Sequence, residues 1–168
     1  MQSRMNHPAM ILPGAMQALQ ALGAAAAKTG LSGRTIELVQ LRASQINGCS
    51  VCVDMHSQAL RKQGETDERL FTVAAWRDTS FFTDAERAAL ALAEAVTRVS
   101  DKADPVSDEL WEEARRHYDE QALAALLLAI STINVWNRLN AATRQVAGAW
   151  RASAEAREAV ERASAAVP

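Results

Sequence analysis

Both cysteines of the 168-residue chain lie in one short segment, NGCSVCVDMH, which spans residues 47 to 56. Two residues separate Cys49 from Cys52, and His56 follows Cys52 at a spacing of four. Such a cluster suits three kinds of site: a structural disulfide, a zinc site and a reactive dithiol. The choice among them decides what the sequence predicts about function.

A structural disulfide and a zinc site both account poorly for these residues. A disulfide that closes so short a loop removes little chain entropy, about 2 kcal/mol at most, and cytosolic thiols are normally kept reduced. A zinc site needs four ligands, of which Cys49, Cys52 and His56 supply three, with Glu37 as a fourth candidate. A chain with a sizeable helical core does not need a metal in order to fold. We therefore predict no metal and no bound cofactor, and keep zinc as an alternative.

A reactive dithiol fits the spacing better. Gly48 ends one predicted helix and lets the next begin at Cys49, where free N–H groups and the helix dipole favour a thiolate. Cys52 lies one turn further on and shares a helix face with His56, whose imidazole can take a proton from the thiol. The helix start favours Cys49 as the attacking sulfur, whereas the histidine spacing favours Cys52.

A polar stripe on the preceding helix supports this interpretation. Glu37, Gln40, Ser44 and Asn47 repeat at spacings of three, four and three, which places them on one helix face that ends beside Cys49. The alternative is a solvated face. If the stripe instead faces the helix of the cysteines, Glu37 can orient His56 and stabilise its positive charge, directly or through a water molecule.

The rest of the chain shows helix signals only, so we predict an all-α fold of about seven helices in one domain. Capping residues, glycines and apolar spacings of three and four residues set the boundaries. The first five expected helices run from Pro13 to Gly30, from Ser32 to Ile46, from Cys49 to before Gly64, from Thr66 to about Arg77, and from the capping box TDAE at 83–86 to about Val99. A short sixth helix begins at Ser107 and a long seventh at Asp119.

Composition narrows the class of protein. Apolar residues make up 49% of the chain and charged residues 23%, as in soluble globular proteins. A net charge of −2 and an aromatic content of 5% argue against a nucleic-acid partner. The longest apolar run, at 123–133, is too short to span a bilayer and is typical of a buried core helix. We expect a cytoplasmic protein without a membrane partner.

The same patterns divide the chain into three parts. Residues 1–12 form an N-terminal extension, 13–150 the helical domain and 151–168 an Ala- and Glu-rich C-terminal tail, expected to be a peripheral helix or a frayed end. His7 falls in the extension, where we expect a mobile segment. Asn134, Trp136, Asn137 and Arg138 form a polar and aromatic cluster, expected to be structural or to line a pocket.

The segment ELVQLRASQINGCSVCVDMH, residues 37 to 56, resembles the core motif of the alkylhydroperoxidase D-like (AhpD-like) group of the carboxymuconolactone decarboxylase superfamily. The motif runs Glu, eleven residues, Cys, two residues, Cys, three residues, His. The downstream segments WRDTSFFTDAERAALALAEAVT and INVWNRLNAATR resemble the same group, so the likeness covers roughly residues 30 to 148. The decarboxylase branch of the superfamily lacks the two cysteines.

The resemblance implies an all-helical fold that assembles into trimers or hexamers, and thiol-dependent reduction of hydroperoxides in antioxidant defence without metal or haem. By analogy, Cys52 is the peroxide-reacting thiolate, Cys49 the resolving thiol, and His56 with Glu37 the proton relay. A cellular dithiol, of the lipoyl-adaptor type, regenerates the enzyme. Val51 departs from the family, which often has His or Tyr between the cysteines, so one proton-transfer group is missing there.

Two other functions stay open at this stage. One is a dithiol/disulfide oxidoreductase or redox sensor that does not turn over peroxide. The other is a non-catalytic oligomer with a structural zinc or dithiol site.

Overall fold

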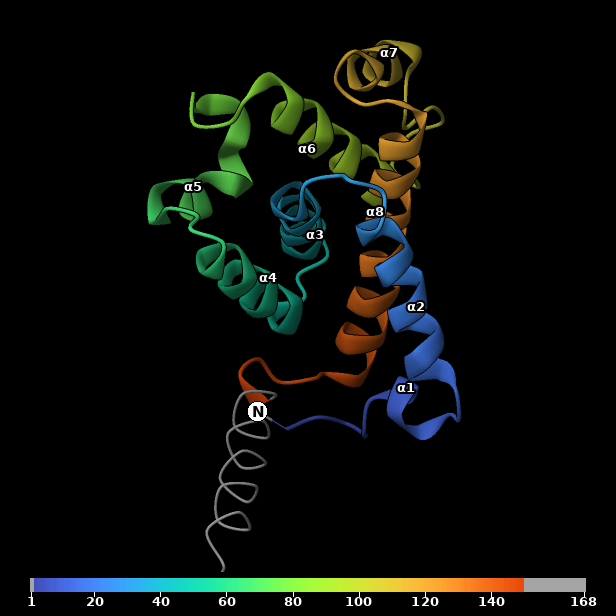
Figure 1. The fold of residues 1–168 in the computed structure, drawn as a ribbon. Coiled ribbons are helices and arrows are strands. Elements are labelled where there is room, and N and C mark those ends of the chain that lie inside the picture. Colours follow the sequence, from blue (N-terminus) through green and yellow to red (C-terminus); the bar gives the residue numbers. More distant parts are fainter. Residues whose placement is uncertain (1, 150–168) are drawn as a thin grey trace, which may run out of the picture.

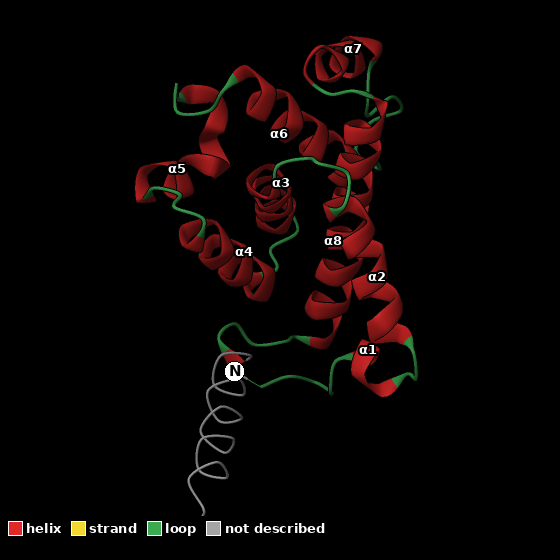
Figure 2. Cartoon of the chain, in the orientation of Figure 1, coloured by secondary structure: helices red, strands yellow, loops and turns green. Residues whose placement is uncertain are grey.

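The computed structural model describes residues 2–149, in which all regular structure is helical (Figures 1 and 2). The all-α prediction is therefore confirmed, whereas the C-terminal tail at 151–168 lies outside the described residues. The elements are α1 (Pro8–Ile11), α2 (Ala15–Ala27), α3 (Gly33–Ile46), α4 (Ser50–Lys62), α5 (Asp67–Thr72), the 3₁₀ segment η1 (Val73–Asp78), α6 (Asp84–Thr97), α7 (Asp108–His117) and α8 (Glu120–Thr143).

Helix α3 forms the centre of the fold, with α4, α6 and α8 packed around it (Figure 1). It can occupy that position because its apolar side chains point in several directions: Leu38 and Leu41 join the core toward α4, α5 and α6, and Val39 joins the core between α6 and α8. All three are fully buried. Removing such side chains from water is the main favourable term in folding, which fixes α3 as the element against which the others are positioned.

Most helix starts follow the predicted capping chemistry. The Thr83 hydroxyl accepts the Glu86 N–H while the Glu86 carboxylate accepts the Thr83 N–H, so the predicted capping box is confirmed. Side-chain oxygens of Thr66, Ser107 and Asp119 likewise accept N–H groups in the first turns of α5, α7 and α8. Ser32 is the residue before α3, but its hydroxyl makes no such hydrogen bond.

The predicted continuous helix from Thr66 to Arg77 is wrong. Helix α5 ends at Thr72 and continues as η1, with non-helical torsions at Ala75 (φ −119°, ψ 31°). The break turns Trp76 into the core, where its indole N–H donates to Glu94 at 3.0 Å. Arg87 from α6 donates to the Trp76 carbonyl at 3.0 Å. These tertiary contacts outweigh the local helical pattern.

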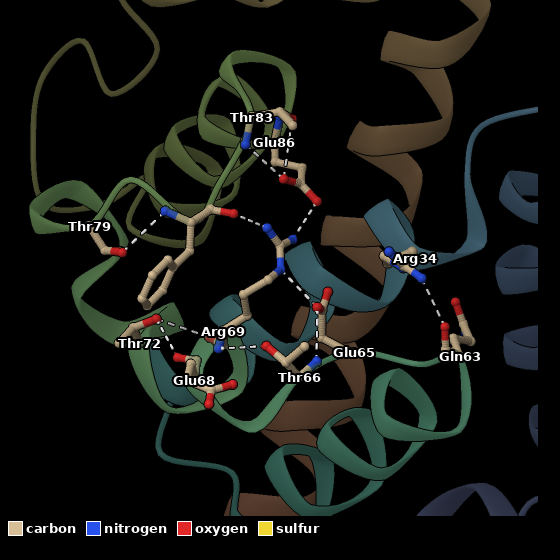
Figure 3. Close-up of polar contacts among 11 residues, drawn as sticks. Arg34, Gln63, Glu65, Thr66, Glu68, Arg69, Thr72, Thr79, Thr83 and Glu86 are labelled. Carbon is tan, nitrogen blue, oxygen red and sulfur yellow. Dashed lines mark hydrogen bonds and ion pairs between the residues drawn. The ribbon is translucent and has the colours of Figure 1, made fainter.

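An ionic cluster fixes the outer end of α4 and α5 to α6 (Figure 3). The Arg69 guanidinium donates to Glu65 at 2.8 Å and to Glu86 at 2.6 Å, and also to the Phe81 carbonyl. Glu65 is nearly inaccessible to solvent, so this pair is less screened than a surface salt bridge. Arg34 at the start of α3 donates to the carbonyl of Gln63, which caps α4. The Arg69 contacts join α5 to α6, and the Arg34 contact holds the end of α4 against the start of α3.

Helix α8 confirms the predicted buried core helix. Leu123, Leu126, Ile130 and Ile133 are all buried. Within residues 2–149, it is also the one helix whose length and composition alone would allow it to cross a membrane. Half of its most apolar window is buried inside the fold, as is common for a core helix, so this is weak support for a membrane span.

The N-terminal segment, which we expected to be mobile, is hydrogen-bonded to the end of α8 in the described part. The Arg4 N–H donates to the Thr143 carbonyl at 2.9 Å and its guanidinium to the Ala142 carbonyl at 3.0 Å, while the Gln145 amide donates to the Met5 carbonyl at 2.9 Å. The segment therefore lies along the last turn of α8 (Figure 1). Contacts between positions about 140 residues apart leave no local signal in the sequence.

Candidate functional site

The two cysteines lie at the start of α4, as predicted. Gly48 adopts a left-handed φ of +66°, which glycine tolerates and which ends α3 and turns the chain into α4. Cys49 is the N-cap residue, and its sulfur accepts the Cys52 N–H at 3.4 Å. The two Sγ atoms lie 2.8 Å apart as free thiols, and each residue is only 3% exposed. The pair is thus positioned for one sulfur to attack the other after oxidation.

The surroundings of the two thiols separate their acidities. A hydrogen bond from the Cys52 thiol lowers the pKa of Cys49 to about 6, against the opposing effect of burial; the Cys52 N–H and the amides of Asn140 and Asn137 add to the lowering. The pKa of Cys52 is raised, by its hydrogen bond to Cys49, by burial and by the negative charge on Cys49. The first proton therefore leaves the Cys49 side of the pair, which is the behaviour expected at a helix N-terminus.

This separation of acidities predicts a measurable titration. The thiolate absorbance of the reduced protein should rise with a midpoint near pH 6, because the charged form of Cys49 is favoured. In Cys52→Ala the hydrogen-bond donor is absent, so the midpoint should move to higher pH. An ultraviolet pH titration of both proteins measures it; a wild-type midpoint near that of an ordinary cysteine, about 8.5, would contradict the description.

A cavity of about 460 Å³ gives access to one of the two sulfurs. Cys52 and His56 both contribute to its wall, whereas Cys49 does not. Polar contributions come from both α3 and α8, and the apolar part of the wall consists of Met16, Val51, Met55, Ile133 and Trp136. Acidity and access therefore point to different cysteines: Cys49 ionises first, but a molecule in the cavity meets Cys52. The cavity has the lining expected of a small-molecule site, apolar with a few polar groups.

Glu37 and His56 meet across the interface between α3 and α4. The Glu37 carboxylate lies 2.7 Å from Nδ1 of His56, and both side chains are partly shielded from solvent. The contact is direct, one of the two arrangements expected from the polar stripe. Because the carboxylate accepts from Nδ1–H, it orients the ring and stabilises an added proton, leaving Nε2 for exchange with another group.

The remaining stripe residues also face protein rather than solvent. Asn47 donates through its amide to both Asn134 and Asn137 of α8 at 2.9 Å, and Asn137 donates to the Ser44 hydroxyl at 3.1 Å. Ser44 is fully buried, and Gln40 contributes to the cavity wall. This amide network connects α3 to α8 directly behind the cysteines, which fixes the position of the α3–α4 turn.

Sequence reasoning missed two residues of the site. The Asn140 amide donates to the Cys52 sulfur at 3.3 Å, one turn after Asn137 on α8. Asn134, Asn137 and Asn140 follow one another at spacings of three, and this helical spacing was the sequence signal that could have identified Asn140. His7 forms part of the cavity wall together with Trp136, their ring centroids 5.2 Å apart. Nothing local in the sequence indicates that contact.

The zinc alternative requires a set of converging ligands. Within residues 2–149 there is no group of three or more His, Cys, Asp or Glu side chains placed to hold a metal ion. His117, on α7, pairs with Glu113 instead.

Comparisons with known proteins agree with this fold and motif. A model of the carboxymuconolactone decarboxylase family matches residues 13–95. The uncharacterized protein YdfG of Bacillus subtilis is 39% identical over 132 residues, which cover 79% of this chain and 88% of that protein. A protein of unknown function from Agrobacterium tumefaciens, provisionally described as the antioxidant defence protein AhpD, superposes with a TM-score of 0.81 at 34% identity, covering 87% of this chain and 98% of that one.

A more distant structure shares the fold alone. It is an uncharacterized peroxidase-related protein of Ralstonia eutropha with an alkylhydroperoxidase AhpD core, and it matches with a TM-score of 0.73 at 21% identity, over 84% of this chain and 74% of that one. Taken with the closer relatives, these matches show that the chain belongs to the carboxymuconolactone decarboxylase family and to its AhpD-like group.

Proposed function

We propose that this protein is a thiol-dependent peroxidase that reduces hydroperoxides through the Cys49–Cys52 dithiol. One observation carries the proposal: the Cys52 thiol lies in the wall of an apolar cavity that it shares with His56, while the sulfur of Cys49 lies 2.8 Å behind it. A peroxidatic sulfur, a proton carrier and a resolving sulfur are thus within one site. The proposal places the protein in antioxidant defence.

The first step oxidises Cys52. Its thiol gives its proton to His56, whose imidazolium is stabilised by Glu37. The thiolate attacks the terminal oxygen of the hydroperoxide, so that an S–O bond forms while the O–O bond breaks. The leaving alkoxide takes the electron pair and the proton held by His56, and departs as an alcohol. Cys52 is left as a sulfenic acid, two electrons more oxidised.

The second step uses Cys49, whose lowered pKa keeps it a thiolate at neutral pH. It attacks the Cys52 sulfur, forming a disulfide and displacing hydroxide, which takes up a proton and leaves as water. An external dithiol then reduces the disulfide, supplying two electrons and two protons. A lipoyl-bearing adaptor is the reductant that the family resemblance suggests.

Access decides which sulfur attacks first in this scheme. Cys49 is the more acidic thiol, but the cavity reaches Cys52 and not Cys49. Transfer of the Cys52 proton to His56 places the negative charge on the accessible sulfur, and the Asn140 amide stabilises it there. The acidity of Cys49 then serves the second step.

A thiol titration tests this proposal. The reduced protein should present two free thiols under denaturing conditions, and one equivalent of an organic hydroperoxide should remove both while producing one equivalent of alcohol. A protein with a purely structural dithiol would keep both thiols. The Cys49→Ser variant is the matched control, since it can lose only one.

Dithiol/disulfide exchange without peroxide turnover is the second candidate. The observation that favours it is Cys49 itself, a buried N-cap cysteine with a pKa of about 6, because such thiolates also react with disulfides. An exchange protein, however, has no need of a 460 Å³ apolar cavity beside its second cysteine.

We further infer that the protein is a homo-oligomer, a trimer or a hexamer. Large apolar side chains are exposed on and beside α1, with Met10 at 68% and Leu12 at 61% exposure, and Leu22 of α2 is also exposed. Exposed apolar side chains such as these are available for contact with a second chain. Light scattering should give about three or six times the chain mass of 18.2 kDa. A mass of one chain at micromolar concentration would contradict it.

A further inference from the structure

His7 occupies a defined position in the cavity wall although it comes from the far N-terminal end of the chain. Its ring packs against Trp136 of α8, and the residues just before it are hydrogen-bonded to the end of that helix. It also begins α1, where Nδ1 accepts the N–H of Ala9 at 3.1 Å. The imidazole is therefore held from two sides and brought into the same cavity as Cys52 and His56.

The contact with Ala9 determines which ring nitrogen carries the proton. A backbone N–H can only donate, so Nδ1 must present a lone pair to it. The proton of the neutral ring is consequently on Nε2. Burial lowers the pKa of His7, which keeps the ring in this neutral form. His7 thus offers a single N–H donor of fixed position.

That donor has no hydrogen-bond partner among the described residues. Three buried side-chain atoms of residues 2–149 lack any hydrogen-bond partner: Nε2 of His7, Oγ1 of Thr132 and Oε2 of Glu65. Two of these three belong to residues of the cavity wall, and Thr132 is only 2% exposed. Buried polar groups are nearly always satisfied, so two unsatisfied ones on residues of one cavity wall leave hydrogen-bonding capacity for a bound molecule.

Two polar groups near the cysteines already have hydrogen-bond partners. His56 is paired with Glu37, and the Asn140 amide donates to the Cys52 sulfur. Val51, between the two cysteines, contributes only apolar surface to the cavity. Besides Nε2 of His56 and the Gln40 amide, a reacting oxygen beside Cys52 can take a further hydrogen-bond donor from the cavity wall.

We propose that His7 supplies this donor: its Nε2–H binds the leaving oxygen of the hydroperoxide and stabilises the negative charge that develops there. The inference rests on the proposed peroxidase function. As the Cys52 sulfur bonds to the terminal oxygen and the O–O bond breaks, charge accumulates on the oxygen attached to the organic group. His7 keeps its proton throughout, and the alkoxide is protonated by His56. Donors positioned in this way act mainly on the transition state.

Two substitutions separate the donor from the capping role. In His7→Asn the side-chain oxygen can still accept the Ala9 N–H, since asparagine is a good N-cap, but nothing reaches the position of Nε2. In His7→Gln the amide nitrogen lies where Nε2 was, but the cap acceptor is lost. The assay is kcat/KM for tert-butyl hydroperoxide with a small dithiol reductant, alongside the thermal midpoint of each variant.

We expect His7→Asn to lower kcat/KM roughly 10–10²-fold, somewhat less than the loss of a full oxyanion-hole donor. His7→Gln should stay within about threefold of the wild type, since it retains an N–H at the same place. With a peroxy acid, whose carboxylate leaving group is far less basic, the loss in His7→Asn should shrink. A purely structural role of His7 would not depend on the leaving group.

Three results would overturn the inference, each recognisably different. Wild-type kcat/KM in His7→Asn shows that the donor is not used. Equal losses in both variants and with both substrates, accompanied by a lowered thermal midpoint, show that His7 acts through folding alone. No consumption of either peroxide by the wild type refutes the peroxidase function and the role of His7 with it.

Discussion

Cys52→Ser abolishes hydroperoxide consumption, whereas Cys49→Ser still reacts once and then stops. The first result follows because the cavity reaches only the sulfur of residue 52, and a serine hydroxyl at neutral pH is far too weak an acid to replace a thiolate. The second follows because Cys49 acts only after oxidation, by attacking the sulfenic acid from 2.8 Å away. Intact-mass measurement of Cys49→Ser after one equivalent of hydroperoxide should show one added oxygen atom.

The opposite pattern would reverse the assigned roles. If Cys49→Ser loses the first turnover and Cys52→Ser keeps it, the acidity of Cys49 matters more than the access to Cys52. Both variants replace a buried sulfur by a smaller polar atom, so their circular dichroism and thermal midpoints must first be compared with those of the wild type. A loss of activity in a folded variant is then chemical.

Glu37→Gln should slow peroxide reduction without unfolding the protein. The carboxylate lies 2.7 Å from Nδ1 of His56 and stabilises the imidazolium that forms when Cys52 gives up its proton. An amide of the same size keeps a hydrogen bond but removes the charge. General acid–base groups contribute about 10²–10⁴-fold in rate, and a group that acts through one of them should contribute less, roughly 10–10²-fold. The rate of sulfenic acid formation under single-turnover conditions measures the effect.

The pH dependence distinguishes a proton relay from a structural contact. Although the pKa of Cys52 is raised, the small fraction of it that solvent ionises grows about tenfold per pH unit and does not need the relay, so the rate loss in Glu37→Gln should become smaller toward about pH 9. Glu113→Gln is a matched control, because Glu113 also lies beside a histidine, His117 at 3.3 Å, but on α7 and outside the cavity. It should be silent at every pH. A Glu37→Gln variant as active as this control would show that the relay does not operate.

Local chemistry explains which parts of this fold could be predicted. Capping groups at Thr66, Thr83, Ser107 and Asp119 act on N–H groups two or three residues away, so a short window of sequence contains the whole interaction. The start of α4 could be predicted equally well, because Gly48 and the cysteines are close together in the sequence. Helix α5 was overextended since the burial of Trp76 against Glu94 lies beyond any such window.

The same distinction between local and tertiary contacts decides which parts of the candidate site could be predicted. The pairing of Glu37 with His56 could be anticipated because both lie on consecutive helices joined by a three-residue turn, and helical spacing fixes their faces. Asn140 and His7 could not, since their places depend on how α8 and the N-terminal segment pack. The order of the two cysteines also stays open to experiment: helix-start electrostatics and cavity access act on different sulfurs, and only the second requires the tertiary structure.

Steady-state turnover of the wild-type protein tests the central claim most directly. Reduced protein is mixed with an excess of an organic hydroperoxide and an excess of a small dithiol such as dihydrolipoamide, and alcohol and oxidised dithiol are quantified over time. A peroxidase should produce many equivalents of alcohol per protein chain, one for each dithiol oxidised, and Cys52→Ser should produce none above the uncatalysed rate. One equivalent of alcohol followed by no further loss of hydroperoxide, with reduced dithiol still in excess, would contradict the peroxidase function.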